Sequence, residues 1–219
     1  MITIMPRSTS GTRFVLKAAL VACSLSGLAL ALQPEGKPAA MPAMDKKQIA
    51  AMMGMKGQPG PEQKFLETLV GTFDTEYNLT TMPGTPPLVA KGSQKGEMVL
   101  GGRFLQVHST PAADEELKIE SLSYLGFDNR NKKYFWWGID STDTYSVFAE
   151  GDMDPATKTI TLLGENEEPG MGKMPFKTIF KLADPDRTTM EIWFQFKGAP
   201  GAEADGWFRI MEMIKTRKK

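Results

Sequence analysis

Short runs in which apolar and polar residues alternate dominate the chain from residue 73 onward. The first run, residues 73–79, reads FDTEYNL, and a period of two residues is that of a β-strand with one buried face. Clusters of Gly, Pro, Asp and Asn separate such runs, as is typical of turns. We therefore predict about ten strands, at residues 73–79, 88–99, 103–110, 118–126, 133–139, 144–151, 157–163, 176–182, 188–196 and 207–216.

One short helix is predicted before the first strand. Pro61 and Glu62 stand where a helix N-terminus favours proline and acidic residues, and Phe65 and Leu69 give it an apolar face, which Gly71 ends. Consecutive antiparallel strands leave two exposed sheet edges unless the sheet closes on itself. The pattern predicts an all-β fold, an antiparallel up-and-down β-barrel of about ten strands with the short N-terminal helix at one mouth.

Residues 1–31 have the organisation of a secretory signal peptide. They contain no Asp or Glu, and three basic residues precede an apolar run over residues 18–31. The run is shorter than the roughly 20 residues of a transmembrane helix. We expect cleavage after Ala31 and a mature protein that is exported to the periplasm or beyond the cell, with no transmembrane segment. Leu20-Val21-Ala22-Cys23 also matches a lipoprotein box, so a lipid anchor at Cys23 is the alternative.

Residues 32–60 predict a flexible linker, and residues 61–219 a single barrel domain. The linker is rich in Met, Pro, Ala and Gly and has no aromatic residue, so it buries too little apolar surface to offset the entropy of ordering. A short helical turn near residues 46–53 is compatible with its composition. Thioethers favour Cu(I), which makes the linker methionines a speculative copper site: Met41, Met44, Met52, Met53 and Met55.

Composition excludes several classes of function. The 26 basic and 26 acidic residues balance, so the basic face of a nucleic-acid-binding protein is not expected. A single His and a single Cys exclude multi-histidine and cysteine-based metal centres. Phosphate-binding glycine motifs and a serine-nucleophile motif are absent from the sequence. We therefore expect no cofactor, and no set of residues identifies a catalytic site.

Large aromatic residues stand on both faces of two predicted strands, which exceeds what a one-sided core requires. They predict either a barrel cavity with an aromatic lining or an outer wall that meets a partner. The candidate ligand-binding residues are Tyr124, Trp136, Trp137 and Trp193, with Arg103 and His108 as polar anchors. A shift of one residue in strand parity would exchange the inner and outer faces, so the inner face stays open.

Two signatures bring in a resemblance to known proteins. The segment LVGTF at residues 69–73 is similar to the Gly-x-Trp motif of lipocalin-like barrels, with Phe73 in place of Trp, and Arg217 resembles the C-terminal Arg that packs over that ring. This resemblance implies structural closure of the barrel by Phe73 and Arg217, because a cation on an aromatic face contributes about 0.5–2 kcal/mol.

Most of residues 61–219 also resembles the bacterial family known as domain of unknown function fifteen-seventy-nine. The matching segments read GTF at 71–73, MPG at 82–84, GGRF at 101–104, GFDN at 126–129, KKY at 132–134, Trp137 with Asp140-Ser141, Gly151-Asp152 with Thr157-Lys158, and Met211-Glu212 through Thr216-Arg217. The chain departs from the family at Phe73 and Phe127. The family implies a secreted lipocalin-like barrel and supplies no catalytic residues.

The sequence favours a non-enzymatic barrel that binds a small hydrophobic or amphiphilic ligand. One alternative is an envelope protein-interaction module with a packed barrel, and another is periplasmic Cu(I) handling. A carbohydrate-directed enzyme using Asp140 or Glu191 has the weakest support, because nothing in their spacing brings the two carboxylates together. The identity of a ligand and the oligomeric state stay open at this stage.

Overall fold

The computed structural model describes residues 43–219 except 56, 83, 169, 171, 197 and 199–201. The helices are α1 (Lys46–Met55) and α2 (Pro61–Leu66), and a 3₁₀ turn, η1 (Glu67–Leu69), follows α2. The strands are β1 (Gly71–Leu79), β2 (Leu88–Val99), β3 (Phe104–Pro111), β4 (Ser121–Asp128), β5 (Lys133–Asp140), β6 (Val147–Asp154), β7 (Thr159–Glu168), β8 (Gly172–Lys181), β9 (Arg187–Gln195) and β10 (Trp207–Arg217). None of the described helices has the length and apolar character needed to cross a bilayer.

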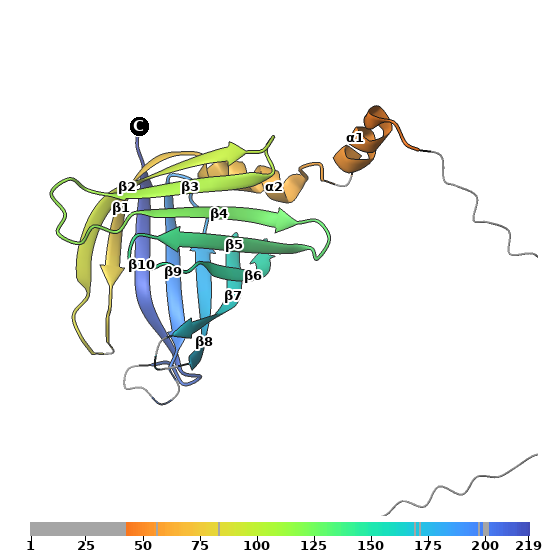
Figure 1. Cartoon of the computed structure of the whole chain (residues 1–219). Coiled ribbons are helices and arrows are strands. Elements are labelled where there is room, and N and C mark those ends of the chain that lie inside the picture. The colour runs from red at the N-terminus through yellow and green to blue at the C-terminus, as the bar shows by residue number, and fades with distance from the viewer. Residues whose placement is uncertain are drawn as a thin grey trace, which may run out of the picture. The chain divides into compact units, whose positions relative to one another are not determined.

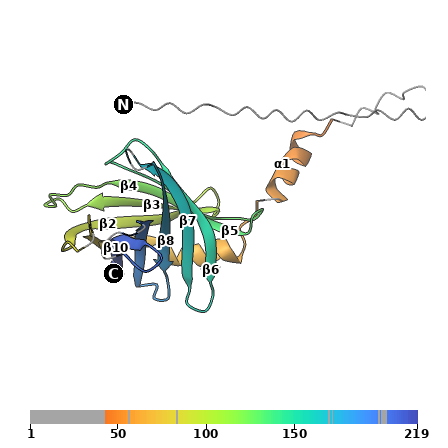
Figure 2. The same ribbon diagram turned by 90° about the horizontal axis from the view of Figure 1, so that it is seen from below.

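The strands form one closed antiparallel barrel. Each strand pairs with its neighbours along the chain, and β1 pairs with β10 from Phe73↔Arg217 to Leu79↔Met211, which closes the sheet. Figures 1 and 2 show the strands curving around a common interior. The predicted all-β, up-and-down barrel with one short helix before its first strand is therefore confirmed. The prediction of about ten strands is met by the ten described here.

The β7–β8 hairpin is the main difference from the predicted strands. The strand β8 begins at Gly172, whereas the pattern predicts a start at Phe176. The additional arm is held by ladder pairing with β7 and by an ion pair of 2.8 Å between Lys173 Nζ and Glu165 Oε1. Both of these side chains are exposed, and Met174 is the one buried apolar residue that β8 adds before Phe176, which is too little apolar alternation for the arm to be recognised.

The segment α2–η1 packs against one end of the barrel, here called the helix end. Pro61 fits the first helical turn because its missing N–H needs no partner there. The side chain of Gln63 accepts a hydrogen bond from Gly60 N (2.7 Å) and donates one to Phe127 O on β4 (3.1 Å). Leu66 and Leu69 are buried in the same cluster as the barrel core. The opposite end is called the mouth.

The core fills the helix end and the middle of the barrel. Besides Leu66 and Leu69 it contains buried side chains from every strand except β1 and β2: Leu105, Leu125, Phe127, Tyr134, Trp136, Ala149, Ile160, Leu162, Phe176, Phe180, Met190 and Met213. Burial of this apolar surface is the main stabilising contribution. The side chains near the mouth pack less completely, and this is where the interior becomes accessible.

Candidate functional site

Strand alternation determines which side chains face the barrel interior. On β1, Thr75 is buried while Asp74 and Glu76 are exposed, and on β5, Tyr134 and Trp136 are buried. The same alternation continues around the closed sheet, so each strand contributes every second residue to the interior. A ligand inside the barrel would therefore contact these inward-facing side chains.

A cavity of about 130 Å³ lies inside the barrel at the mouth. Trp136 contributes a large ring and is 9% exposed, and Gly138 leaves room beside it, because a Cβ there would lie 3.0 Å from Trp136 Cζ2. The wall is mostly aromatic, aliphatic or thioether, with a few polar groups: Tyr77, Leu79, Gln94, Ser109, Ile119, Ser121, Ser123, Trp136, Gly138, Ile139, Asp140, Val147, Met190, Ile192, Met211 and Met213.

Such a wall is the usual composition of a small-molecule site. Sites for drug-sized ligands measure roughly 300–1,000 Å³, so the smaller cavity here suits a small or slender molecule. The polar groups of the wall are already ordered. Gln94 Nε2 donates to Ser109 Oγ at 2.9 Å and lies 3.9 Å from Met213 Sδ. The wall therefore offers mainly apolar contact and a few oriented dipoles.

A polar layer lies directly beneath the cavity, toward the helix end, and consists of Thr75, Lys215 and Thr188. Lys215 on β10 stands opposite Thr75 on β1 and Thr188 on β9 in the sheet register. The exposed fractions are 4%, 4% and 0% for Thr75, Lys215 and Thr188. Both threonine hydroxyls are without a hydrogen-bond partner among the residues that the structure describes. Burial lowers the pKa of Lys215 to about 8. We refer to these three residues as the Lys215 layer.

Of the predicted ligand-binding aromatic residues, only Trp136 faces the interior. Tyr124 and Trp137 belong to the opposite parity on β4 and β5, and their rings contact each other on the outer face with centroids 5.9 Å apart. Neighbouring residues of a strand point to opposite faces, so Trp136 and Trp137 cannot share one interior site. The predicted set is therefore not brought together.

Trp193 also faces outward, into a polar cluster on β8, β9 and β10. Its Nε1 donates to Glu191 Oε2 at 3.0 Å, and Lys177 Nζ lies 4.7 Å from the Trp193 ring and 4.6 Å from the Trp207 ring. These contacts occupy the indole on the outside of the barrel. Trp193 has no place in the interior wall.

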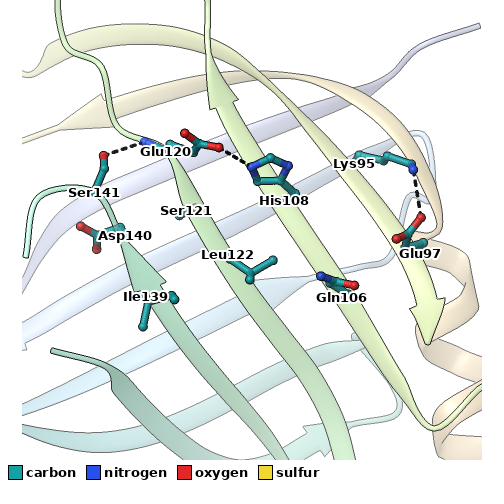
Figure 3. A pocket seen from close by; sticks show the side chains of 10 residues that line it. All are labelled: Lys95, Glu97, Gln106, His108, Glu120, Ser121, Leu122, Ile139, Asp140 and Ser141. Atoms are coloured by element: carbon teal, nitrogen blue, oxygen red, sulfur yellow. Dashed lines mark hydrogen bonds and ion pairs between the residues drawn. The ribbon is translucent and has the colours of Figure 1, made fainter. Parts of the chain in front are cut away.

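His108 lies on the outer face of β3. Its Nε2 lies 2.6 Å from Glu120 Oε1, and both side chains are about half exposed. Figure 3 shows this pair at the edge of an open hollow of about 480 Å³ that also includes Lys95 and Asp140. The hollow is larger than the interior cavity but shallow and solvent-facing. The structure therefore separates His108 from the interior.

Arg103 lies at the β2–β3 turn, at the helix end, and its Nη1 donates to Leu100 O at 2.9 Å. The two carboxylates considered for catalysis are also apart, because Asp140 lines the mouth whereas Glu191 is on the outer face of β9. No pair of carboxylates across a shared cleft results from these positions.

Phe73 and Arg217 meet at the helix end. Arg217 Cζ lies 4.5 Å from the centroid of the Phe73 ring, in a geometry that places the guanidinium against the aromatic face. The same guanidinium donates to Thr68 O and Val70 O, each at 2.7 Å. This contact joins the end of β10 to the segment before β1.

The candidate copper site falls only partly within the described residues. Met44, Met52 and Met53 lie in or next to α1 and are exposed. Met55 ends α1, whereas Met41 is outside the described residues, as are Cys23 and the whole of residues 1–31. Copper binding, the lipid anchor and the signal peptide stay predictions.

The sequence did not identify the most distinctive interior groups, Gln94 and the three residues of the Lys215 layer. Thr75, Gln94, Thr188 and Lys215 are polar residues at inward positions. Polar residues at inward positions interrupt the apolar pattern, and for that reason the pattern alone gives no signal for them.

Comparison with known proteins identifies the fold but no activity. The model of a family described as "Protein of unknown function (DUF1579)" matches residues 58–217. The crystal structure of Rv2717c from M. tuberculosis is similar at 13% sequence identity, covering 74% of this chain and 100% of that chain with a TM-score of 0.51. A redesigned β-barrel, b11L5F_LGL, has 10% identity, covers 70% of this chain and 94% of its own, with a TM-score of 0.34. No curated protein matches.

Proposed function

We propose that this chain, which belongs to the DUF1579 family of proteins of unknown function, binds a small hydrophobic or amphiphilic molecule inside its barrel. The observation that carries the proposal is the interior cavity of about 130 Å³ with its largely apolar wall. An apolar ligand gains free energy by leaving water for such a wall, at about 25 cal/mol per Å² of apolar surface buried.

The arrangement of ionisable residues supports binding rather than catalysis. A hydrolytic site needs an acid and a base that face the same substrate. Asp140 is at the mouth, Glu191 is on the outer face and His108 is in an outer ion pair with Glu120. His108, Glu120 and Asp140 line the same open, solvent-facing hollow, and Glu191 lies elsewhere on the outer face. Among the described residues of the interior cavity wall, Asp140 is the one carboxylate, and the rest of the wall offers mainly aliphatic and aromatic contact.

Filling the cavity tests the proposal. Ser123 lies on the cavity wall, so Ser123→Leu places an aliphatic side chain where the ligand would sit. The added side chain takes the space of the ligand, and a loss of about 1.4 kcal/mol or more in binding free energy corresponds to a tenfold or greater loss of affinity. The measurement is titration calorimetry of octanol, a slender ligand in keeping with the size of the cavity, with wild type and variant.

Leu122→Phe is the matched control, because Leu122 is the next residue on β4 and faces the outer surface. We expect it to bind octanol within about twofold of wild type, since it leaves the cavity unchanged. Equal binding of octanol by Ser123→Leu and wild type would place the ligand outside the barrel and refute the proposal.

A second candidate function, as an interaction module that contacts another copy of this chain, is favoured by the aromatic residues outside the barrel. Phe135 and Phe148 stack with ring centroids 6.2 Å apart, and Phe148 is 50% exposed. Exposed apolar groups of this size are typical of contact surfaces. Sedimentation of wild type and Phe148→Ser tests it, and a monomer for both proteins excludes this function.

Export belongs to the same proposal and is supported by the basic and apolar pattern of residues 1–31. The mass of the protein recovered from the exporting cells distinguishes cleavage after Ala31 from lipidation at Cys23. An intact N-terminus on the cytoplasmic protein would reject both.

A further inference from the structure

Lys215 is a cation without an anionic partner inside the barrel. Among the described residues, no ion pair or hydrogen bond involves its ammonium group, and its one described contact is with the Phe73 ring, 5.8 Å from Nζ to the centroid. Buried charges in proteins are as a rule paired or hydrogen-bonded, because desolvation of a free ion is strongly unfavourable. The position is therefore expensive to maintain unless something binds there.

Two hydroxyl groups share the position with Lys215. Thr75 and Thr188 are its cross-strand partners on either side, and directly opposite residues have Cβ atoms about 5 Å apart. Neither Oγ1 has a partner in the described structure. Buried hydroxyls without a partner are unfavourable. Together with the ammonium group, the layer therefore presents three donor groups without acceptors among the described residues.

No carboxylate of the neighbouring strands faces this layer. Asp74 is paired with Lys218 and Asp186 with Arg217 at the outer surface. The carboxylate of Glu191 lies outside the barrel, beside Lys181. The other charged group at this end, Arg217, is itself a cation that lies over the same Phe73 ring as Lys215. Asp186 balances the charge of Arg217, so the unbalanced charge of this layer is that of Lys215.

The Lys215 layer lies next to the cavity along β9 and β10. Met190 and Met213 line the cavity. Met213 is two residues before Lys215 on β10, and Met190 is two residues after Thr188 on β9. Methionine side chains are unbranched and change rotamer readily. The thioethers therefore form a deformable floor through which a narrow head group can reach the ammonium group.

We infer that the Lys215 layer binds the carboxylate of an amphiphilic ligand whose alkyl chain occupies the cavity. This inference rests on the proposed function and specifies its ligand class as an alkyl monocarboxylate. The ammonium supplies the opposite charge and the two threonine hydroxyls donate to the carboxylate oxygens. Trp136 and Ile192 contact the chain. Charge-assisted hydrogen bonds of this kind are about twice as strong as neutral ones.

The experiment compares octanoate with octanol, which share an alkyl chain and differ in the charge of the head group. Titration calorimetry at pH 7 is performed with wild type, Lys215→Met and Lys177→Met. Lys177 is the matched control, because it lies on the outer face between Trp193 and Trp207. Wild type and Lys177→Met should prefer octanoate by about tenfold or more, and Lys215→Met should lose that preference while it still binds octanol.

A preference for octanoate that persists in Lys215→Met would overturn the inference, as would a wild type that binds octanol equally well. In both cases octanol binding would leave the proposed function intact, so the two failures are distinguishable. If neither compound binds wild type, both are refuted. Thr188→Val provides a second test that conserves side-chain shape, and it should reduce the preference for octanoate without altering octanol binding.

Discussion

At the scale of single residues, Lys215 carries a charge whose burial opposes folding. Lys215 is only 4% exposed, and the Phe73 ring at 5.8 Å offers only a weak cation–π contact. Desolvation therefore lowers its pKa from 10.5 to about 8. At neutral pH the folded protein holds the proton against this cost, whereas the unfolded chain holds it freely in water.

The stability of the protein should consequently rise at alkaline pH. Below about pH 8 Lys215 is protonated in both the folded and the unfolded protein, so its desolvation lowers the free energy of unfolding by the full amount. Between about 8 and 10.5 the unfolded chain binds more protons than the folded one, so the free energy of unfolding increases with pH, by about 3 kcal/mol in total from this group. Lys215→Met should therefore be more stable than wild type at pH 7 by a similar amount.

Urea denaturation of wild type and Lys215→Met between pH 7 and 10.5 measures this effect. Other groups that titrate in this range are common to both proteins, so the difference between the two stability curves isolates Lys215. The difference should narrow as the pH increases. Parallel curves would show that the ammonium group is solvated in the folded protein.

Lys215 also shows why part of the site could not be predicted from the sequence. Phe208 is buried, and strict alternation along β10 would then place Lys215 on the outer face. A bulge at Ile210 breaks the register between Arg209 and Met211 and reverses the parity for the rest of the strand. A bulge inserts one residue without a clear sequence signal, so the inward position of Lys215 becomes visible only in the structure.

At the scale of an element, β9 has an outer face that is held by one buried carboxylate. Glu191 is 2% exposed, its Oε1 lies 2.5 Å from Lys181 Nζ, and its Oε2 accepts from Trp193 Nε1 at 3.0 Å. Burial alone would raise the pKa of Glu191, but these two hydrogen bonds and the positive charges of Lys181 and Arg209 together outweigh it, and the pKa is lowered. The carboxylate thus joins β8 to β9 from outside.

Glu191→Gln should therefore destabilise the protein by about 1–3 kcal/mol at pH 7, because the two donors lose a charged acceptor. Folding favours the ionised form, so its stabilisation is present above the ordinary pKa of 4.5 and is lost as the pH falls through the lowered value in the folded state. Urea titrations at pH 7 and in acid should show that the difference in unfolding free energy between wild type and Glu191→Gln becomes smaller as the pH falls.

Glu165→Gln is the control for this prediction. Glu165 pairs with Lys173 at 2.8 Å, but both side chains are exposed, and such pairs contribute at most about 1 kcal/mol. If Glu191→Gln were no more destabilising than Glu165→Gln, the β9 carboxylate would have no special role.

The aromatic strand β5 sets another limit on sequence interpretation at this scale. Its aromatic residues Tyr134, Phe135, Trp136 and Trp137 are consecutive, so both parities present large rings and neither is preferred by the pattern. In the structure Phe135 contacts Phe104 on the outer face, over Gly126, where a Cβ would lie 2.6 Å from Phe135 Cζ. The neighbouring strands therefore determine that Phe135 lies on the outer face of β5, through contacts that the sequence of β5 alone does not show.

At the scale of the whole molecule, the order of ten strands followed from the sequence because each strand pairs with its chain neighbours. Up-and-down pairing requires only local hairpins and one final closure. That closure, between β1 and β10, joins residues far apart in the sequence. Two signals indicated it: the exposed edges that an open sheet of ten strands would leave, and the resemblance of Phe73 and Arg217 to a known barrel motif. The contacts that hold the closure were not predictable from that motif.

Arg217 connects the end of β10 to two other segments at the helix end. Its guanidinium donates to Thr68 O and Val70 O before β1, to Pro185 O (3.1 Å) and to the carboxylate of Asp186 (3.1 Å) in the β8–β9 turn. Gly71 is needed for this approach, because its φ is 131° and a Cβ would lie 2.5 Å from Arg217 Nη1. A planar fork of donors is suited to binding several carbonyls at once.

Removal of this fork should loosen the closure of the barrel as a whole. Arg217→Met retains an apolar side chain over Phe73 but loses the hydrogen bonds and the charge, and we expect a loss of about 2–3 kcal/mol in the free energy of unfolding. Lys218→Met is the matched control, because its ion pair with Asp74 is exposed and should contribute less than about 1 kcal/mol. Urea denaturation measures both. Equal losses of unfolding free energy in the two variants would mean that backbone pairing of β1 with β10 closes the barrel without help from Arg217. A larger loss in Arg217→Met would show that the Arg217 side chain stabilises the closed sheet.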